Sequence, residues 1–285
     1  MILRLSFNSL KYDERKLRTC IESFLMDKNN DQAFPWRLFF AELAGTAILL
    51  MIGLSLVILM FGTGSSMADI IPNVKLRQVM TGFLFGGTGA LIAISPLGKE
   101  SGAHINPAVT MSFWLFKKID SRTALIYVVA QLIGAVIGTL PLLLWGQLGQ
   151  SISFGATTPG VGYTTQNALL GEVITTFTMV SLLAIFLGFR QIRPYTPALF
   201  PFLYSIMVPL EADISGISTN PARSFGPAVI SGTWDSWWIY WVGPLAGALL
   251  ACIFTSRLAK RITEAKLYHF DSDEDRLARK IKTAE

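Results

Sequence analysis

Apolar residues gather in six long blocks that short polar connections separate. The blocks cover about residues 38–61, 78–97, 121–145, 167–188, 196–210 and 237–257. Most of them approach the ~20 residues that a helix needs to cross a bilayer. The fifth block is shorter and contains three prolines, so its ends are the least sharply defined. The pattern predicts six membrane-spanning helices and argues against a soluble protein built around a hydrophobic core.

Two shorter apolar segments, about 107–116 and 221–231, each begin at an Asn-Pro-Ala sequence, in "HINPAVT" and "TNPARSF". Asn is a favoured helix N-cap, and Pro is favoured at the first helical position. Each segment is too short to span a membrane, which is typical of a re-entrant half-helix. Irregular backbone at membrane depth is tolerated only where it is buried in protein or lines a water-filled cavity. Two half-helices therefore predict a pore.

Charge adds an orientation to this arrangement. Only 15% of the residues are charged, against roughly 25% in soluble proteins. Lys and Arg gather in residues 1–37, in residues 257–285 and in the connections around residues 99, 117–122 and 190–193. The opposite side carries only Lys75 and Arg77. The positive-inside rule then predicts a multi-pass protein of the plasma (cell inner) membrane with both termini in the cytoplasm, and the net charge of +5 needs no nucleic-acid partner.

These boundaries divide the chain into a cytoplasmic N-terminal extension (1–37), a channel domain (38–257) and a charged cytoplasmic C-terminal tail (258–285). Residues 1–37 are polar and charged, without the apolar stretch of a signal peptide. Two cysteines, Cys20 and Cys252, are too few for a disulfide framework.

The two halves of the apolar region resemble each other. The first block contains "AELAGT" with Glu42, and the fourth contains "GEVITTF" with Glu172. Each half has three spans and one half-helix, so the halves insert with opposite topology as an inverted repeat. The N-termini of the half-helices then face each other near the membrane midplane, each with about half a positive charge from its dipole. The side-chain NH2 groups of Asn106 and Asn220 point into the lumen in this arrangement, where they orient polar molecules and repel cations.

The segments "SGAHINPAV" and "NPARSFGPAV" resemble the two signature boxes of the aquaporin (major intrinsic protein) family, and the resemblance covers about residues 38–257. It implies an all-α membrane protein with an aquaporin-like fold, in which six transmembrane helices and two re-entrant half-helices form an inverted repeat. It also implies one pore per subunit and a homotetramer. The pore motifs are then Asn106, Pro107 and Ala108 in the first half, and Asn220, Pro221 and Ala222 in the second.

Arg223, three residues after Asn220, is an ionisable residue at membrane depth and hence a functional candidate. Its guanidinium stays protonated and presents a fixed positive charge with several donors. In the resembling family this Arg forms a constriction with three further positions, which correspond here to Ile217, Val208 and an aromatic residue on the second span. The aromatic residue is identified with Phe85, which lies one residue further from Asn106 than the resemblance implies.

Three other buried polar residues are expected near the pore. Buried carboxylates need donors, and the resemblance implies that Glu42 and Glu172 accept hydrogen bonds from the re-entrant loops. A proton relay in a coupled transporter is the competing interpretation of these two residues. His104, two residues before Asn106, belongs to the first pore-lining loop.

The cargo depends on Val208. Strict water channels of the family that this chain resembles usually have His at that position. Val is smaller than His, and its side chain forms no hydrogen bond. Glycerol channels of the family typically have Asp after the Arg and a basic residue shortly after, where this chain has Ser224 and Ala228. The sequence therefore predicts a passive channel for water, with ammonia and hydrogen peroxide as further candidates, that excludes protons and ions. A facilitator of glycerol or another small neutral solute is the alternative.

Other functional classes are less well supported. The sequence has no metal-ligand cluster, no nucleophile–base pair and no phosphate-binding glycine loop, so we expect neither an enzyme nor a cofactor. A secondary transporter shares the inverted repeat but requires uptake driven by an ion gradient. A junctional membrane protein would use the uncharged connection 146–166 and show no osmotic permeability.

Overall fold

The computed structural model describes residues 33–270. Most of the predicted N-terminal extension, with Cys20, and the tail from residue 271 onward lie outside the described residues. Among the described residues, the chain from Trp36 to residue 270 forms one compact unit. All regular elements among the described residues are helical, which confirms the predicted all-α fold class.

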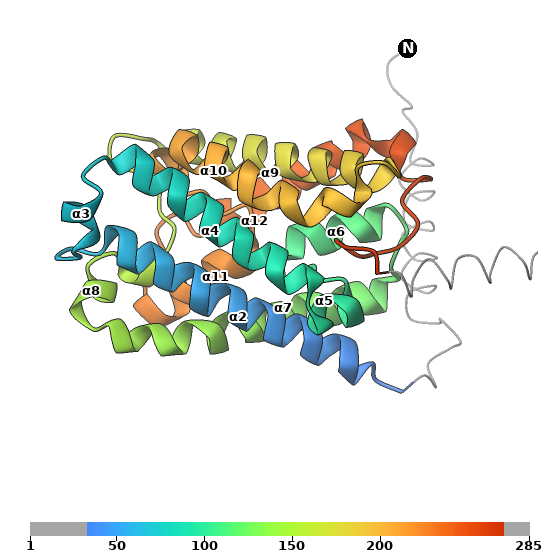
Figure 1. Ribbon diagram of the computed structural model, residues 1–285, viewed down its shortest axis with the longest axis horizontal. Helices are drawn as coiled ribbons and strands as arrows, with labels where there is room; N and C mark the ends of the chain where they lie inside the picture. Colours follow the sequence, from blue (N-terminus) through green and yellow to red (C-terminus); the bar gives the residue numbers. More distant parts are fainter. Residues whose placement is uncertain (1–32, 271–285) are drawn as a thin grey trace, which may run out of the picture. The chain divides into compact units, whose positions relative to one another are not determined.

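Six long helices run along the horizontal direction of Figure 1. They are α2 (Trp36–Phe61), α4 (Val74–Ile94), α7 (Ser121–Thr139), α9 (Thr165–Gly188), α10 (Thr196–Ser215) and α12 (Ile239–Phe254), and they correspond to the six predicted blocks. Within the described part of the chain, four segments are long and apolar enough to cross a membrane, and Ile239–Phe254 is a shorter apolar helix. The four are Trp36–Phe61, Ser121–Trp145, Thr165–Gly188 and Arg193–Ser215.

Two predicted boundaries were wrong because polar residues extend the helices beyond their apolar runs. Helix α4 begins at Val74 rather than near 78, since the side chain of Asn73 accepts a hydrogen bond from the backbone N–H of Leu76 and caps the first turn. Helix α10 continues past 210 to Ser215, through Glu211 and Asp213, and ends at Gly216 with a φ of 79°.

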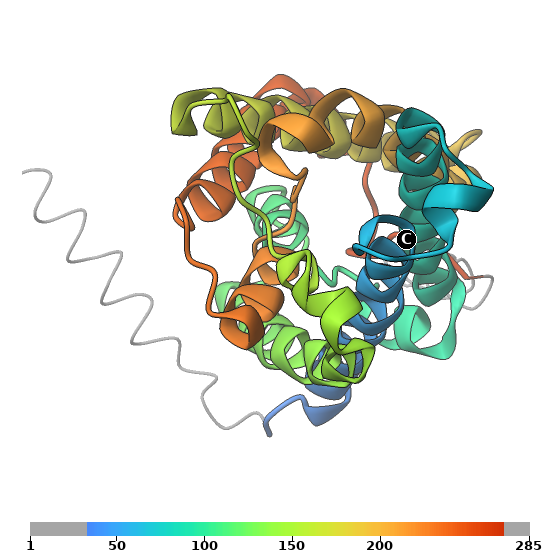
Figure 2. The ribbon, with the colours of Figure 1, turned by 90° about the vertical axis from the view of Figure 1, so that its left-hand side faces the viewer.

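The two short apolar segments form the half-helices α6 (Pro107–Leu115) and α11 (Pro221–Ser231). A short helix, α5 (Pro96–Ser101), precedes α6. The helices α3 (Met67–Ile70) and α8 (Gln147–Gln150) lie at the left end of the unit in Figure 1, and α5 lies toward the right end. Figure 2 shows the long helices arranged in a ring.

The helix pairs with the most extensive packing reflect the inverted repeat. Helix α2 packs on α7 in the first half and α9 on α12 in the second, while α4 packs on its counterpart α10. Small residues permit this close approach. An added Cβ would lie 2.2 Å from the carbonyl oxygen of Tyr204 at Gly82, and 2.2 Å from that of Ala47 at Gly138.

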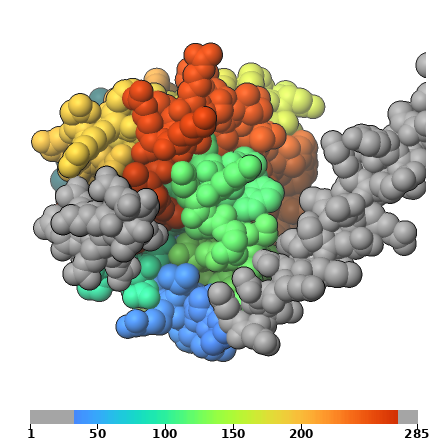
Figure 3. Space-filling model, turned by 90° about the vertical axis from the view of Figure 1, so that its right-hand side faces the viewer, coloured from blue at the N-terminus to red at the C-terminus, as the bar shows by residue number. Residues whose placement is uncertain are grey.

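The chain continues beyond α12 through a short 3-10 turn, Ser256–Leu258, and remains part of the compact unit up to residue 270. Ile262 and Leu267 are both buried. Figure 3 views the right-hand side of Figure 1 and shows the red atoms of this C-terminal segment beside the green atoms of the α6–α7 region. The first part of the predicted tail is therefore packed against the helices.

Candidate functional site

The N-termini of the two half-helices meet through their capping asparagines. The Asn106 side-chain oxygen accepts a hydrogen bond from the backbone N–H of Ala108 at 2.8 Å, and Asn220 caps Ala222 in the same way at 3.0 Å. Each side chain also reaches the opposite loop: Asn106 Nδ2 donates to the Thr219 carbonyl, and Asn220 Nδ2 to the Ile105 carbonyl, both at 2.9 Å. This arrangement uses one of the two N–H donors of each amide and leaves the other for a molecule in the lumen.

The loops before the two asparagines have matching backbone conformations. In "SGAHIN" the positive φ angles fall on Gly102, Ala103 and Ile105, at 92°, 54° and 43°. In "SGISTN" they fall on the equivalent residues Gly216, Ile217 and Thr219, at 79°, 44° and 51°. A positive φ is unfavourable for residues with a side chain, and it persists only where the surroundings hold it.

Glu42 supplies such a restraint in the first half. Its buried carboxylate accepts hydrogen bonds from Ser101 Oγ at 2.6 Å and from the backbone N–H groups of His104 at 2.9 Å and Ile105 at 2.7 Å. Gln131 Nε2 on α7 donates a fourth bond at 2.8 Å. These donors compensate for the burial of the carboxylate.

Glu172 restrains the pore loop of the second half in the same way. Its carboxylate accepts from Ser215 Oγ at 2.7 Å and from the backbone N–H groups of Ser218 at 2.6 Å and Thr219 at 2.8 Å. The Tyr240 hydroxyl donates to the Ser215 carbonyl at 2.8 Å, as the Tyr127 hydroxyl does to the equivalent carbonyl in the first half at 2.7 Å. Sequence reasoning anticipated the two carboxylates but not these two hydroxyl donors.

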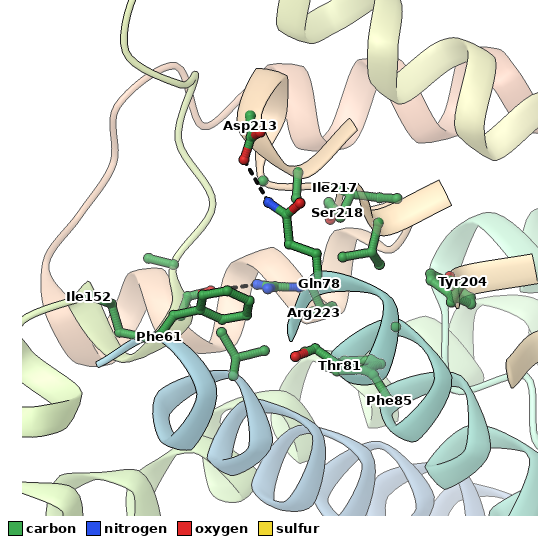
Figure 4. A pocket seen from close by; sticks show the side chains of 17 residues that line it. Phe61, Gln78, Thr81, Phe85, Ile152, Tyr204, Asp213, Ile217, Ser218 and Arg223 are labelled. Carbon is green, nitrogen blue, oxygen red and sulfur yellow. Dashed lines mark hydrogen bonds between the residues drawn. The ribbon is translucent and has the colours of Figure 1, made fainter. Parts of the chain in front are cut away.

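A cavity of about 270 Å³, which we call the wide cavity, brings together all four predicted filter residues, Phe85, Val208, Ile217 and Arg223. Arg223 is largely buried, and its Nη1 donates to the Gly155 carbonyl at 2.6 Å. Figure 4 shows that Arg223, Ile217 and Phe85 come from different elements of the fold. Of the polar lining residues, Gln78 donates to Asp213 at 2.6 Å.

A second cavity of about 50 Å³, the narrow cavity, is lined by Asn106, Asn220 and His104. Four residues line both cavities and mark the passage between them: Phe85, Tyr204, Ser218 and Arg223. Sequence reasoning missed Tyr204, although it lies four residues before Val208 and hence on the same face of α10. Its hydroxyl is hydrogen-bonded to Thr219 Oγ1 at 2.5 Å.

His104 lines the narrow cavity, but its ring is held by protein on several sides. Nε2 lies 3.1 Å from the Ala265 carbonyl, which can only accept, so Nε2 carries the hydrogen. Nδ1 then accepts from the Thr110 hydroxyl, 3.2 Å away. The ring also stacks on Phe113 with the ring centroids 4.5 Å apart. The imidazole therefore connects the first pore loop to the C-terminal segment.

Comparisons with known proteins find a family and relatives that match about three quarters of the chain. Residues 29–254 match the family described as "Major intrinsic protein". Aquaporin-4 of Mus musculus is 34% identical over 224 residues, which are 77% of this chain and 66% of that protein, so the chain spans about two thirds of this relative's length. Aquaporin AqpM of Methanothermobacter marburgensis is 33% identical over 236 residues, 75% of this chain and 93% of that protein.

Among solved structures, the aquaglyceroporin from Plasmodium falciparum superposes with a TM-score of 0.62 at 22% sequence identity. The match covers 78% of this chain and 95% of that one. At this level of identity the likeness concerns the fold alone.

Proposed function

Because the chain belongs to the major intrinsic protein family, we propose that it conducts water and small neutral solutes and excludes protons and ions. Members of this family are passive membrane channels and not enzymes, and the aquaporin-like fold predicted from the sequence is confirmed. The observation that carries the proposal is the reciprocal pair of Asn106 and Asn220, which line the same narrow cavity as Arg223.

Exclusion of protons and ions follows from fixed positive potential in a confined passage. Arg223 contributes a permanent charge, and the N-terminus of each half-helix contributes about half a charge. A water molecule between Asn106 and Asn220 accepts hydrogen bonds from their amides, which turns its oxygen toward them. This orientation interrupts a chain of donors and acceptors that could carry a proton, and the positive potential repels cations.

The cargo is set by the wide cavity. Three of the four proposed filter residues, Phe85, Val208 and Ile217, are apolar, so Arg223 is the one cationic member. This composition supports the passage of water, with ammonia and hydrogen peroxide as further cargo. Glycerol transport is the second candidate, because Val208 leaves more room than the His of strict water channels.

We further propose a homotetramer in the plasma (cell inner) membrane with both termini in the cytoplasm and the domain boundaries given above. Outward-facing apolar side chains along the long helices support contact with lipid or a neighbouring subunit. Examples with more than half of their surface exposed are Leu125, Leu170, Ile174, Phe202, Leu210 and Ile253.

Stopped-flow light scattering on proteoliposomes tests the proposed function, with water, glycerol, ammonia and hydrogen peroxide measured side by side. We expect water permeability above that of empty liposomes. Water permeability equal to that of empty liposomes, with the protein intact in the membrane, would overturn the proposal. Uptake that depends on an ion gradient would favour a coupled transporter instead.

Replacing Val208 with His should narrow the wide cavity and add a hydrogen-bonding group. We expect permeability to ammonia, hydrogen peroxide and glycerol to fall about tenfold while water still passes, because selectivity depends on pore diameter and lining donors. Val208→Ala is the control, since it adds neither bulk nor polarity, and it should not lower these permeabilities. Equal solute permeability in the wild type and Val208→His would remove Val208 from the filter.

Tyr204 should limit solute size at the passage between the cavities. In Tyr204→Ala the missing ring joins the wide and narrow cavities, and we expect glycerol permeability to rise about tenfold because the pore becomes wider. Tyr204→Phe keeps the ring and loses only the hydroxyl, which is bonded to Thr219 and to Met179 Sδ, so its glycerol permeability should stay near the wild-type value. An equal rise in glycerol permeability in both variants would show that the hydroxyl rather than the ring controls passage. No rise in either would show that Tyr204 does not limit solute size.

A further inference from the structure

The C-terminal segment beyond α12 reaches the lining of the narrow cavity. Leu267 is only 4% exposed and lines this cavity together with Asn106, Asn220 and Arg223. It comes from "EAKLYHF", a mostly polar stretch, so the chain buries one aliphatic side chain of this stretch inside the candidate pore. Burial of an apolar side chain is favourable and holds the segment in place.

Two hydrogen bonds join this segment to the first pore loop. The backbone N–H of Leu267 donates to the Gly102 carbonyl at 3.1 Å, and His104 Nε2 donates to the Ala265 carbonyl at 3.1 Å. The contact is tight, since an added Cβ at Gly102 would lie 2.2 Å from the Ala265 oxygen. The loop that positions Asn106 is therefore also the surface on which the segment docks.

Further contacts hold the segment on either side of Leu267. Arg193, in the connection between α9 and α10, donates from Nη2 to the Arg261 carbonyl at 3.2 Å and from Nη1 to Thr263 Oγ1 at 3.3 Å. Beyond Leu267, the Lys99 ammonium lies 5.7 Å from the centre of the Phe270 ring, within the range of a cation–π interaction. The backbone around Leu267 is thus fixed to connections of both halves.

The position of Leu267 has a direct effect on passage through the pore. The narrow cavity measures about 50 Å³ against about 270 Å³ for the wide one. A cavity needs about 10–15 Å³ of such volume to hold one water molecule, so the narrow cavity holds only a few. Leucine offers no donor or acceptor to these waters, and hydrophobic constrictions close pores by excluding water.

We propose that residues 263–270 form a plug in which Leu267 closes the pore on the side of the C-terminal segment. Water then passes when the segment leaves the first pore loop as a unit. The inference rests on the proposed channel function. Opening must break the contacts of residues 263–270 with the first pore loop, and the helices of the channel can stay folded when it does.

Leu267→Ala in the full chain tests the plug in proteoliposomes. The smaller side chain no longer fills the mouth, and we expect water permeability to rise about tenfold as the open population grows. Tyr268→Phe is the matched control, because it keeps the ring that packs on Phe270 and lies outside the lining of both cavities. Its water permeability should stay near the wild-type value.

Thiol labelling gives a readout that does not depend on transport. In a chain with Cys20 and Cys252 replaced by Ala, a thiol introduced by Leu267→Cys should react with a water-soluble maleimide about tenfold more slowly than one introduced by Tyr268→Cys, because only the former is buried in the pore. Equal labelling rates would overturn the plug.

The outcomes separate the plug from the channel function. If the wild type and Leu267→Ala both conduct water above empty liposomes at the same rate, the channel function stands and the plug is overturned. If neither conducts water, the channel function is overturned, and the plug as its gate falls with it. Higher water permeability in Leu267→Ala than in a wild type that itself conducts above empty liposomes, together with slow labelling of the thiol at position 267, supports both.

Discussion

Arg223→Val should make the channel leak protons. The guanidinium is the one fixed charge among the four proposed filter residues, and it lines both cavities. Without it, the positive potential in the passage comes only from the two half-helix N-termini, about half a charge each. Valine also leaves a wider opening. We therefore expect proton flux to rise about tenfold or more and glycerol permeability to increase, since both depend on the barrier at the constriction.

The fold should survive this change. The Nη1 of Arg223 donates to the Gly155 carbonyl at 2.6 Å, and this carbonyl would lose its partner in the variant. Gly155 itself lines the wide cavity, so a water molecule can replace the guanidinium as donor. A changed selectivity can then be assigned to the pore rather than to misfolding.

Proton flux can be measured with a pH-sensitive dye trapped in proteoliposomes, alongside water permeability by light scattering. Arg223→Lys is the matched variant, because it keeps a positive charge but loses the planar guanidinium. It should retain most of the proton exclusion. Wild-type proton flux and solute selectivity in Arg223→Val would show that Arg223 does not form the constriction.

Local patterns in the sequence were sufficient to predict the main features of the pore. Asn106 and Asn220 were predictable as facing caps because an N-cap followed by Pro is a local pattern, and the repeat fixed their opposite orientation. The bonds from each asparagine to the opposite loop were not predictable, since they depend on the approach of residues that lie more than a hundred positions apart. The resemblance did imply loop donors to Glu42 and Glu172, but it gave no sign that Gln131 donates to Glu42 from α7.

The pore-lining positions of Tyr204 and Leu267 could not be predicted from the sequence. Tyr204 lies in an apolar run in which many side chains are equivalent by pattern, and only the packing of α4 on α10 selects the face that lines the cavities. Leu267 stands among charged and polar residues, so hydropathy assigns it to a solvated tail. Leu267 is buried because the chain folds back to Gly102, and no periodic pattern in the sequence predicts this contact.

The second large effect is expected from Glu172→Leu, which removes a buried acceptor from three donors. The backbone N–H groups of Ser218 and Thr219 would remain buried without their partner. Each such group costs about 1–3 kcal/mol, so the loss is a large fraction of the roughly 5–15 kcal/mol that stabilises a typical protein. We expect a strongly lowered unfolding temperature in detergent and little or no water permeability, because the loop that positions Asn220 is no longer held.

A graded series distinguishes this restraint from a proton relay. Glu172→Gln keeps one acceptor oxygen and places an NH2 group toward a donor, so it should lie between the wild type and Glu172→Leu in both unfolding temperature and water permeability. Glu42→Gln and Glu42→Leu should follow the same order, since Glu42 restrains the equivalent N–H groups in the first half. Glu100→Leu is the control, because that carboxylate is exposed.

The two interpretations of the carboxylates differ in what Glu172→Gln does to transport. In a proton-coupled transporter the amide would abolish uptake driven by a proton gradient and leave the stability of the fold unchanged, because it removes only the titrating group. In a channel braced by Glu172, water permeability is independent of any gradient and falls together with the unfolding temperature. Thermal unfolding and light scattering on the same preparation therefore decide between the two roles, and an unchanged unfolding temperature in Glu172→Leu would contradict the structural one.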